Sequence, residues 1–159
     1  MPRSASGQQL YVSFGAGQPG TSSVAEYDVT TGVANPNFIT GAVINANFIT
    51  GLSRPITLAL SGNDLFVVNF NNNTVGEYNA ATGAAINANL ITGLSGPWGL
   101  AVSGNTLFVA NNSGGTVGEY DATTGAAINA NFIRLNFPGA LAVSGNNLFV
   151  TAGAVVDFS

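Results

Sequence analysis

The chain is short, acidic and poor in charge: its 159 residues carry three basic and seven acidic side chains, a formal net charge of −4, and no cysteine or histidine. An acidic chain without a basic cluster is a poor partner for nucleic acid, and the lack of cysteine excludes a disulfide framework and thiol-based chemistry. No apolar run reaches the roughly 18 residues of a membrane span, so we expect no membrane insertion; the N-terminal residues lack the apolar stretch of a secretory signal.

An internal repeat dominates the sequence. The phrase Gly-x-x-Leu-aromatic-Val occurs four times, at Gly7, Gly62, Gly104 and Gly145. Residues 52–93 align without a gap on residues 94–135, with 27 of 42 positions identical. A period of this length indicates a repeat architecture in which each copy is one supersecondary unit.

Each period predicts four short strands, A to D, which the third copy illustrates in chain order. Strand A is expected at 98–102 and strand B at 107–110, because these are short apolar runs on either side of a Ser-Gly-Asn turn signal. Strand C is expected at 117–120, and strand D at 127–133, where apolar and polar residues alternate as in a half-exposed strand. Four strands in about 42 residues are typical of a β-propeller blade.

The sequence therefore predicts an all-β fold, a β-propeller of four-stranded antiparallel blades, in a single repeat domain covering 1–159. The boundaries are 7–51 for blade 1, 52–93 for blade 2, 94–135 for blade 3 and 136–159 for a partial blade 4. Blade 1 has strands B, C and D without a strand A, and blade 4 has A, B and a shortened C at 154–158. The total is roughly three and a half to four blades.

The D region of blade 1 is duplicated, because Asn-Phe-Ile-Thr-Gly at 37–41 recurs at 47–51. The second copy could add an outer strand or bulge out as a loop, and the sequence leaves both open. Ring closure is open as well, since propellers usually need at least four blades and an open arc would expose apolar faces. The chain is a fragment, one half of a ring completed by self-association or additional blades, or a strained four-blade closure.

The repeat resembles the NHL/YVTN class of bacterial β-propeller repeats, on the residues Ser103-Gly-Asn-Thr-Leu-Phe-Val-Ala-Asn111 and Thr116-Val-Gly-Glu-Tyr-Asp121. More narrowly, it is similar to near-identical repeat arrays of secreted bacterial proteins, many of which bear a PEP-CTERM sorting tail. The resemblance implies an extracellular or cell-surface location and a scaffold role without an assigned activity.

Acidic residues recur at fixed positions of the repeat. Glu26, Glu77 and Glu119 share one position of strand C, where they are either a cation or acid–base set or a structural carboxylate in each blade. We favour the structural role, because a repeated scaffold position seldom carries a single active site. Asn79 and Asp121, each followed by Thr-Gly, are expected to form turns through their side chains. Without histidine or cysteine the usual bases and nucleophiles are absent, so we expect no enzymatic activity, metal or cofactor.

The copies diverge mainly in the D–A and B–C loops, which share one face of a propeller. Aromatic and amide side chains in these loops suit contacts to sugar or peptide. The candidate ligand-binding residues are Arg54, Phe70, Asn71, Trp98 and Asn112. Trp98 could instead fill the gap between two blades.

These observations predict a non-catalytic extracytoplasmic scaffold that presents loops to a protein or carbohydrate partner. Two alternatives remain: an NHL-like hydrolase or lyase that needs residues outside this chain, and a purely structural repeat of a longer surface protein.

Overall fold

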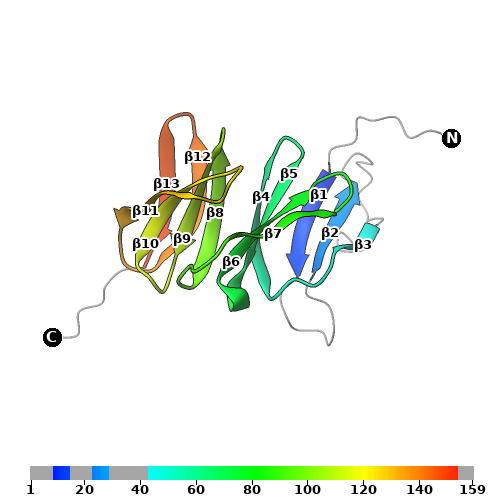
Figure 1. Cartoon of the computed structure of the whole chain (residues 1–159), viewed down its shortest axis with the longest axis horizontal. Coiled ribbons are helices and arrows are strands. Elements are labelled where there is room, and N and C mark those ends of the chain that lie inside the picture. Colours follow the sequence, from blue (N-terminus) through cyan, green and yellow to red (C-terminus); the bar gives the residue numbers. More distant parts are fainter. Residues whose placement is uncertain (1–8, 15–22, 29–42, 154–159) are drawn as a thin grey trace, which may run out of the picture.

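A computed structural model describes residues 9–14, 23–28 and 43–153, which form antiparallel sheets set side by side (Figure 1). The strands are β1 (Gln9–Phe14), β2 (Ser23–Asp28), β3 (Val43–Ile49), β4 (Pro55–Ser61), β5 (Asp64–Asn69), β6 (Thr74–Asn79), β7 (Ala85–Ile91), β8 (Pro97–Ser103), β9 (Thr106–Asn111), β10 (Thr116–Asp121), β11 (Ala127–Arg134), β12 (Pro138–Ser144) and β13 (Asn147–Ala152). One turn of 3-10 helix, η2 (Phe70–Asn72), lies between β5 and β6. Among the described residues, no helix has the length and apolar character that a membrane crossing requires.

The sheets match the predicted blades, which confirms the all-β prediction. Blade 1 contributes β1-β2-β3, blade 2 β4-β5-β6-β7, blade 3 β8-β9-β10-β11 and blade 4 β12-β13, with neighbours in each order paired. Strands that are consecutive in sequence are adjacent in space, because tight turns join them as antiparallel hairpins. The strand C predicted at 154–158 lies outside the described residues.

Strand D pairs with strand C in the same irregular way in three blades. Val24 faces Ile49, Val75 faces Ile91 and Val117 faces Ile133, and each pair is followed by two register shifts. In blade 1 this strand is β3, which includes the start of the second copy of the duplicated segment. The second copy therefore supplies the outer strand, while the first copy lies outside the described residues.

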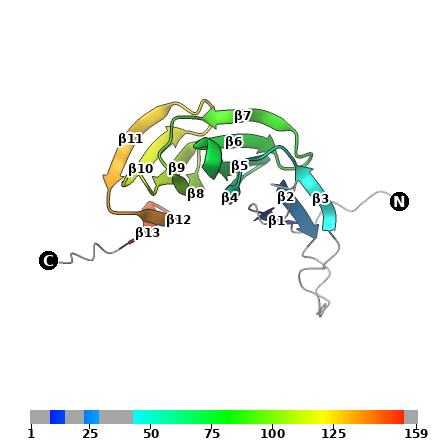
Figure 2. The ribbon, with the colours of Figure 1, turned by 90° about the horizontal axis from the view of Figure 1, so that it is seen from below.

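The sheets stand around an arc (Figure 2). The outermost strands β3, β7 and β11 follow its convex rim, and β4, β8 and β12 lie toward the inside. Strand β7 exposes its first five residues to solvent and β11 exposes most of its length, so the rim strands are more exposed than the half-exposed pattern predicted.

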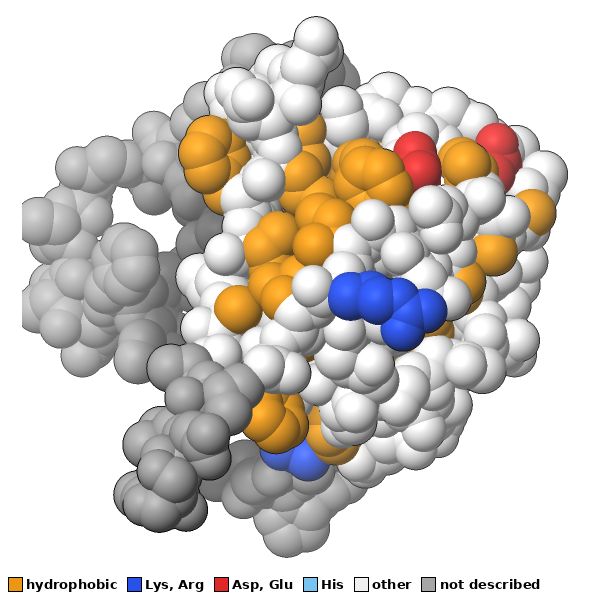
Figure 3. Space-filling view, turned by 90° about the vertical axis from the view of Figure 1, so that its left-hand side faces the viewer, with side chains coloured by type: hydrophobic (Ala, Val, Ile, Leu, Met, Phe, Trp, Pro, Cys, Tyr) orange, Lys and Arg blue, Asp and Glu red, His pale blue; other side chains and the backbone are white. Residues whose placement is uncertain are grey.

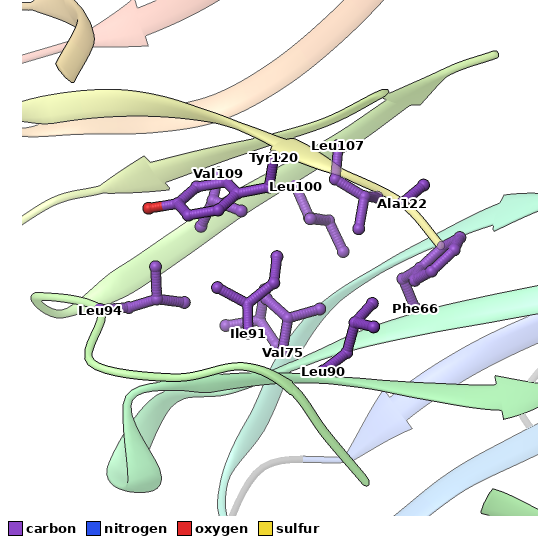
Figure 4. Close-up of a cluster of buried hydrophobic side chains, with 11 residues drawn as sticks. Phe66, Val75, Leu90, Ile91, Leu94, Leu100, Leu107, Val109, Tyr120 and Ala122 are labelled. Carbon is purple, nitrogen blue, oxygen red and sulfur yellow. The ribbon is translucent and has the colours of Figure 1, made fainter. Parts of the chain in front are cut away.

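The hydrophobic core lies between the sheets. One cluster joins blades 1 and 2 and includes Ile49, Leu65 and Tyr78. The larger cluster joins blades 2 and 3, where Phe66, Val75 and Ile91 meet Leu107 and Tyr120 (Figure 4). The middle strands β5 and β6 are buried along almost their whole length because blades cover both of their faces.

Candidate functional site

The D–A and B–C loops meet at the same edge of each blade, which we call the loop face. One backbone hydrogen bond recurs there in three blades: Phe70 N–H donates to the Arg54 carbonyl (3.1 Å), Asn112 N–H to the Gly96 carbonyl (3.0 Å) and Gly153 N–H to the Phe137 carbonyl (3.3 Å). The bond holds equivalent positions together whatever side chains they carry. The backbone of the loop face is therefore constant, while its chemistry differs from blade to blade.

A buried asparagine anchors this backbone in blades 2 and 3. Asn69 Oδ1 accepts a hydrogen bond from Ser53 N–H at 3.2 Å, and Asn111 Oδ1 accepts one from Ser95 N–H at 3.3 Å. Asn69 also bonds the hydroxyl of Tyr78. Burial raises the pKa of Tyr78, and the bond to Asn69 offsets part of that shift.

Strand A begins with a proline in blades 2, 3 and 4, and the residue just before this proline has a left-handed backbone conformation. The φ angles are 52° at Arg54, 59° at Gly96 and 47° at Phe137. Glycine adopts this conformation without strain, whereas a residue with a Cβ atom does so at a cost of about 1–2 kcal/mol. Blades 2 and 4 thus carry large side chains where the loop geometry favours glycine.

Three of the predicted site residues contact one another in a row across blades 2 and 3. The guanidinium carbon of Arg54 lies 4.5 Å from the centroid of the Phe70 ring. The Phe70 and Trp98 rings meet edge to face, with centroids 5.9 Å apart and planes at 89°. We call these residues the Arg54–Phe70–Trp98 cluster.

The cluster is open to solvent and carries an unneutralised charge. Trp98 keeps 43% of its surface exposed, Arg54 is exposed and Phe70 is half-buried. No carboxylate in the described part of the chain forms an ion pair with Arg54. Trp98 is held through its backbone, because its carbonyl accepts a hydrogen bond from Thr57 Oγ1 at 2.6 Å.

Solved structures share this architecture. A computationally designed protein, Ika4, is 20% identical with a TM-score of 0.57 over 81% of this chain and 72% of that one. A functionally unknown protein from Desulfotomaculum acetoxidans is 22% identical with a TM-score of 0.67, over 91% and 45% of the two chains. The calcium-binding protein regucalcin from Agrobacterium tumefaciens is 21% identical with a TM-score of 0.58, over 86% and 46%.

The chain is built from β-propeller blades. No protein-family model matches its sequence, and no curated protein matches it. The chain spans less than half the length of the Desulfotomaculum and Agrobacterium propellers. At these identities the likeness establishes the propeller fold alone.

The other predicted site residues lie outside the cluster. Asn71 is exposed, and its N–H donates to the Ser53 carbonyl at 3.3 Å. Asn112 occupies in blade 3 the position that Phe70 has in blade 2, and its Nδ2 donates to the Pro138 carbonyl at 3.1 Å. That bond ties blade 3 to blade 4, so the Asn112 side chain serves the blade junction.

Phe137 is a loop-face residue that the sequence candidates did not include. It is 60% exposed and has the same left-handed backbone as Arg54. The sequence could have identified Phe137 through its equivalence with Gly96. A glycine in one copy of a repeat indicates a backbone conformation that the other copies must also adopt.

The repeated glutamates do not form a compact acidic site in the part of the propeller that is described. Glu77 is buried opposite Phe66 in the register, and its pKa is raised by this burial and then by the Asp64 carboxylate. Glu119 is half-buried. Within residues 9–14, 23–28 and 43–153, no group of three or more His, Cys, Asp or Glu side chains could hold a metal ion.

The glycine beside each glutamate makes room for tyrosine. A Cβ atom at Gly76 would lie 2.7 Å from the Tyr78 hydroxyl, and one at Gly118 would lie 2.6 Å from Tyr120 Cε2. In both blades the tyrosine ring therefore folds back over the glycine two residues earlier.

A cavity of about 260 Å³ lies away from the loop face, between blades 3 and 4. It is lined by Ser103, Thr106, Phe108, Phe132, Val143, Gly145, Asn146, Asn147 and Leu148. These residues come from strands A, B and D and the A–B turn of blade 4, at the opposite end of the strands from Arg54. The cavity and the Arg54–Phe70–Trp98 cluster are thus separate features.

Proposed function

We propose that this propeller is a non-catalytic scaffold that binds a protein or carbohydrate partner on its loop face, at the Arg54–Phe70–Trp98 cluster. One observation carries the proposal. Residues that differ between near-identical repeats meet in a single exposed cluster, while the conserved residues around them form the frame. A surface that differs between copies on a constant backbone is free to serve recognition.

The chemistry of the cluster favours a ligand with an apolar face beside an acidic group. Exposed tryptophan and phenylalanine rings stack on sugar or aliphatic faces at low entropic cost. Arg54 presents a planar guanidinium that bonds carboxylates in a two-pronged geometry. A uronic acid glycan and an acidic peptide segment both offer this combination.

Backbone strain at Arg54 supports a role for its side chain. Gly96 at the same position of blade 3 has the same left-handed φ without the steric cost. Strained residues are retained where the side chain matters for function. The lack of histidine and cysteine supports a non-catalytic role.

The proposal includes an extracytoplasmic location. Its support is the resemblance of the repeat to arrays in secreted bacterial proteins, together with the sparse charge of the chain. Cell fractionation of the native host, with this chain detected by antibody, tests the location independently of any ligand.

Trp98 is the single tryptophan of the chain, so its fluorescence reports on the cluster alone. We expect titration with a uronate-containing oligosaccharide or an acidic peptide to change the Trp98 emission saturably. The Arg54→Gly variant should weaken this binding at least tenfold. The matched control is Phe137→Gly, which relieves the same backbone strain in blade 4 without touching the cluster, and it should bind like the wild type.

The proposal fails if neither class of ligand changes the Trp98 emission, or if Arg54→Gly and Phe137→Gly bind equally well. Neutral oligosaccharides of the same length test whether the acidic group of the ligand is needed, because they should bind more weakly than the acidic ones. Far-UV circular dichroism of each variant separates lost binding from lost folding.

A further inference from the structure

Among the described residues, blade 4 has one face covered by blade 3 and one exposed face. Along β12 and β13 the exposed and half-buried residues alternate, as expected for a sheet that is covered on one side only. The half-buried residues Val143 and Leu148 line the cavity toward blade 3. The alternating exposed set is Ala140, Ala142, Ser144, Asn147, Phe149 and Thr151, which we call the end face.

The end face is uncharged, and Phe149 is its one large apolar side chain. Phe149 alone keeps 56% of its surface exposed. Figure 3 views this end of the arc and shows hydrophobic side chains gathered at its centre. Exposed hydrophobic side chains that gather on one face mark an interaction site.

The repeat shows what covers this surface elsewhere in the chain. Phe66 occupies in blade 2 the position of Phe149 in blade 4, yet it is 2% exposed. It is buried in one cluster with Leu107 and Tyr120 of blade 3 (Figure 4). The partner that fits the end face is therefore another blade that presents leucine and tyrosine at those two positions.

Equivalent residues of strand D also become more exposed toward the end of the arc. Leu90 of β7 is 7% exposed, because blade 3 packs against it, whereas Phe132 at the same position of β11 is 44% exposed. Phe132 faces only the two described strands of blade 4. The blade junctions thus cover their apolar residues less completely toward the end of the arc.

Blade 1 offers the matching positions. Leu10 faces Tyr27 across β1 and β2, in the register in which Leu107 faces Tyr120 across β9 and β10. In the described part of the chain, no sheet precedes β1–β3 in the arc. Blade 1 of a second molecule therefore carries, at the same register, the residue types that cover Phe66 within one molecule.

We propose that two copies of this chain close a ring, with the end face of each blade 4 packed on blade 1 of the other copy. One copy aligns with 45% and 46% of the two propellers from Desulfotomaculum and Agrobacterium and with 72% of the designed chain Ika4, so the first two have room for a second copy. Two identical junctions then cover the end face of each copy in a closed twofold arrangement. No charged group of the end face has to be desolvated, which favours burial of the junction.

The test is the mass in solution of the full chain, measured by light scattering across a range of concentrations. We expect a dimer for the wild type and a monomer for Phe149→Asp. Ile128→Asp is the matched control, because Ile128 is equally exposed, at 57%, but lies on the rim strand β11. This control should remain a dimer.

A second measurement maps the junction in this cysteine-free chain. Separate preparations of Phe149→Cys and Leu10→Cys are mixed and treated with a short bis-maleimide linker. Rapid cross-linking of this pair, and slow cross-linking of Ile128→Cys with Leu10→Cys, supports the ring. A wild type that stays monomeric, a dimer that Phe149→Asp does not dissociate, an assembly larger than two, or equal cross-linking of both pairs overturns it.

Discussion

At the residue scale, identical side chains behave differently according to what covers them. Glu77 and Glu119 stand at the same position of the repeat, but Glu77 is buried in the junction of blades 2 and 3 and Glu119 is half-buried. Burial without a charge partner disfavours the ionised form of a carboxyl group. The protonation of Glu77 is therefore linked to folding.

We expect Glu77→Gln to stabilise the protein at pH 7. Because the folded pKa of Glu77 is raised above its ordinary value of 4.5, the folded state loses stability as pH rises from about 4.5 through that pKa. Glutamine removes this loss, so the gain in Tm should be present at pH 7 and vanish at pH 4. Glu119→Gln is the control and should change Tm less. A lower Tm of Glu77→Gln at pH 7 would contradict the argument.

The left-handed backbone of Arg54 gives a second prediction at this scale. Arg54→Gly and Arg54→Ala both remove the contact with Phe70, but only glycine accepts a φ of 52° without strain. We expect the glycine variant to be more stable than the alanine variant by about 1 kcal/mol. Urea denaturation measures the difference. At Ser103, a β-strand residue without positive φ, alanine should be the more stable of the two.

At the scale of the elements, the C–D turn depends on one side-chain oxygen. Asn79 Oδ1 accepts hydrogen bonds from Ala81 N–H at 2.9 Å and Thr82 N–H at 3.0 Å. Asp121 Oδ1 accepts the equivalent bonds from Thr123 and Thr124. The turn predicted from Asx-x-x-Thr-Gly is therefore confirmed in both blades, with asparagine and aspartate interchangeable.

Asn79→Ala should destabilise the protein by about 1 kcal/mol, because two backbone N–H groups lose their acceptor. Asn79→Asp should leave the stability almost unchanged at pH 7, since Asp121 has the equivalent position in blade 3.

Hydrogen bonds from Thr124 and neighbouring groups hold the pKa of Asp121 below its ordinary value. The contribution of such an aspartate is present above pH 3.8 and is lost as pH falls through the folded pKa. Thermal unfolding at pH 7 and pH 3 separates the two variants.

At the scale of the whole molecule, the main contacts between sheets in the described part of the chain join neighbouring blades. Stability in such an arrangement is approximately a sum of blade and junction contributions. The described part of the chain has its largest buried cluster at the junction of blades 2 and 3. Substitutions in that junction should therefore lower the free energy of unfolding the most.

Phe66→Ala should destabilise the protein by about 3–5 kcal/mol, the range for deleting a fully buried phenylalanine. Ile128→Ala, on the exposed rim, should stay within about 0.5 kcal/mol. Chemical denaturation followed by circular dichroism measures both. Equal effects would place the main core elsewhere.

Local features made much of the fold predictable. The turn signals and short apolar runs act within a few residues of one another, so the sequence predicted the antiparallel strands of the sheets. Divergence between copies also singled out Arg54, Phe70 and Trp98, whose side chains contact one another in the structure. The same comparison of copies also selected Asn112, because the sequence does not show that its side-chain amide donates a hydrogen bond to the Pro138 carbonyl.

By itself, then, the sequence determined the strands, their turns and the repeat, since hydrogen bonding between adjacent strands is decided locally. Only the tertiary structure decided that Arg54 and Trp98, from different blades, meet through Phe70. It alone also decided that Phe66 is buried while Phe149 is exposed. The physical reason is the same in both cases: a residue's contacts across a blade junction depend on the neighbouring blade, and identical repeats acquire different surroundings from their place in the arc.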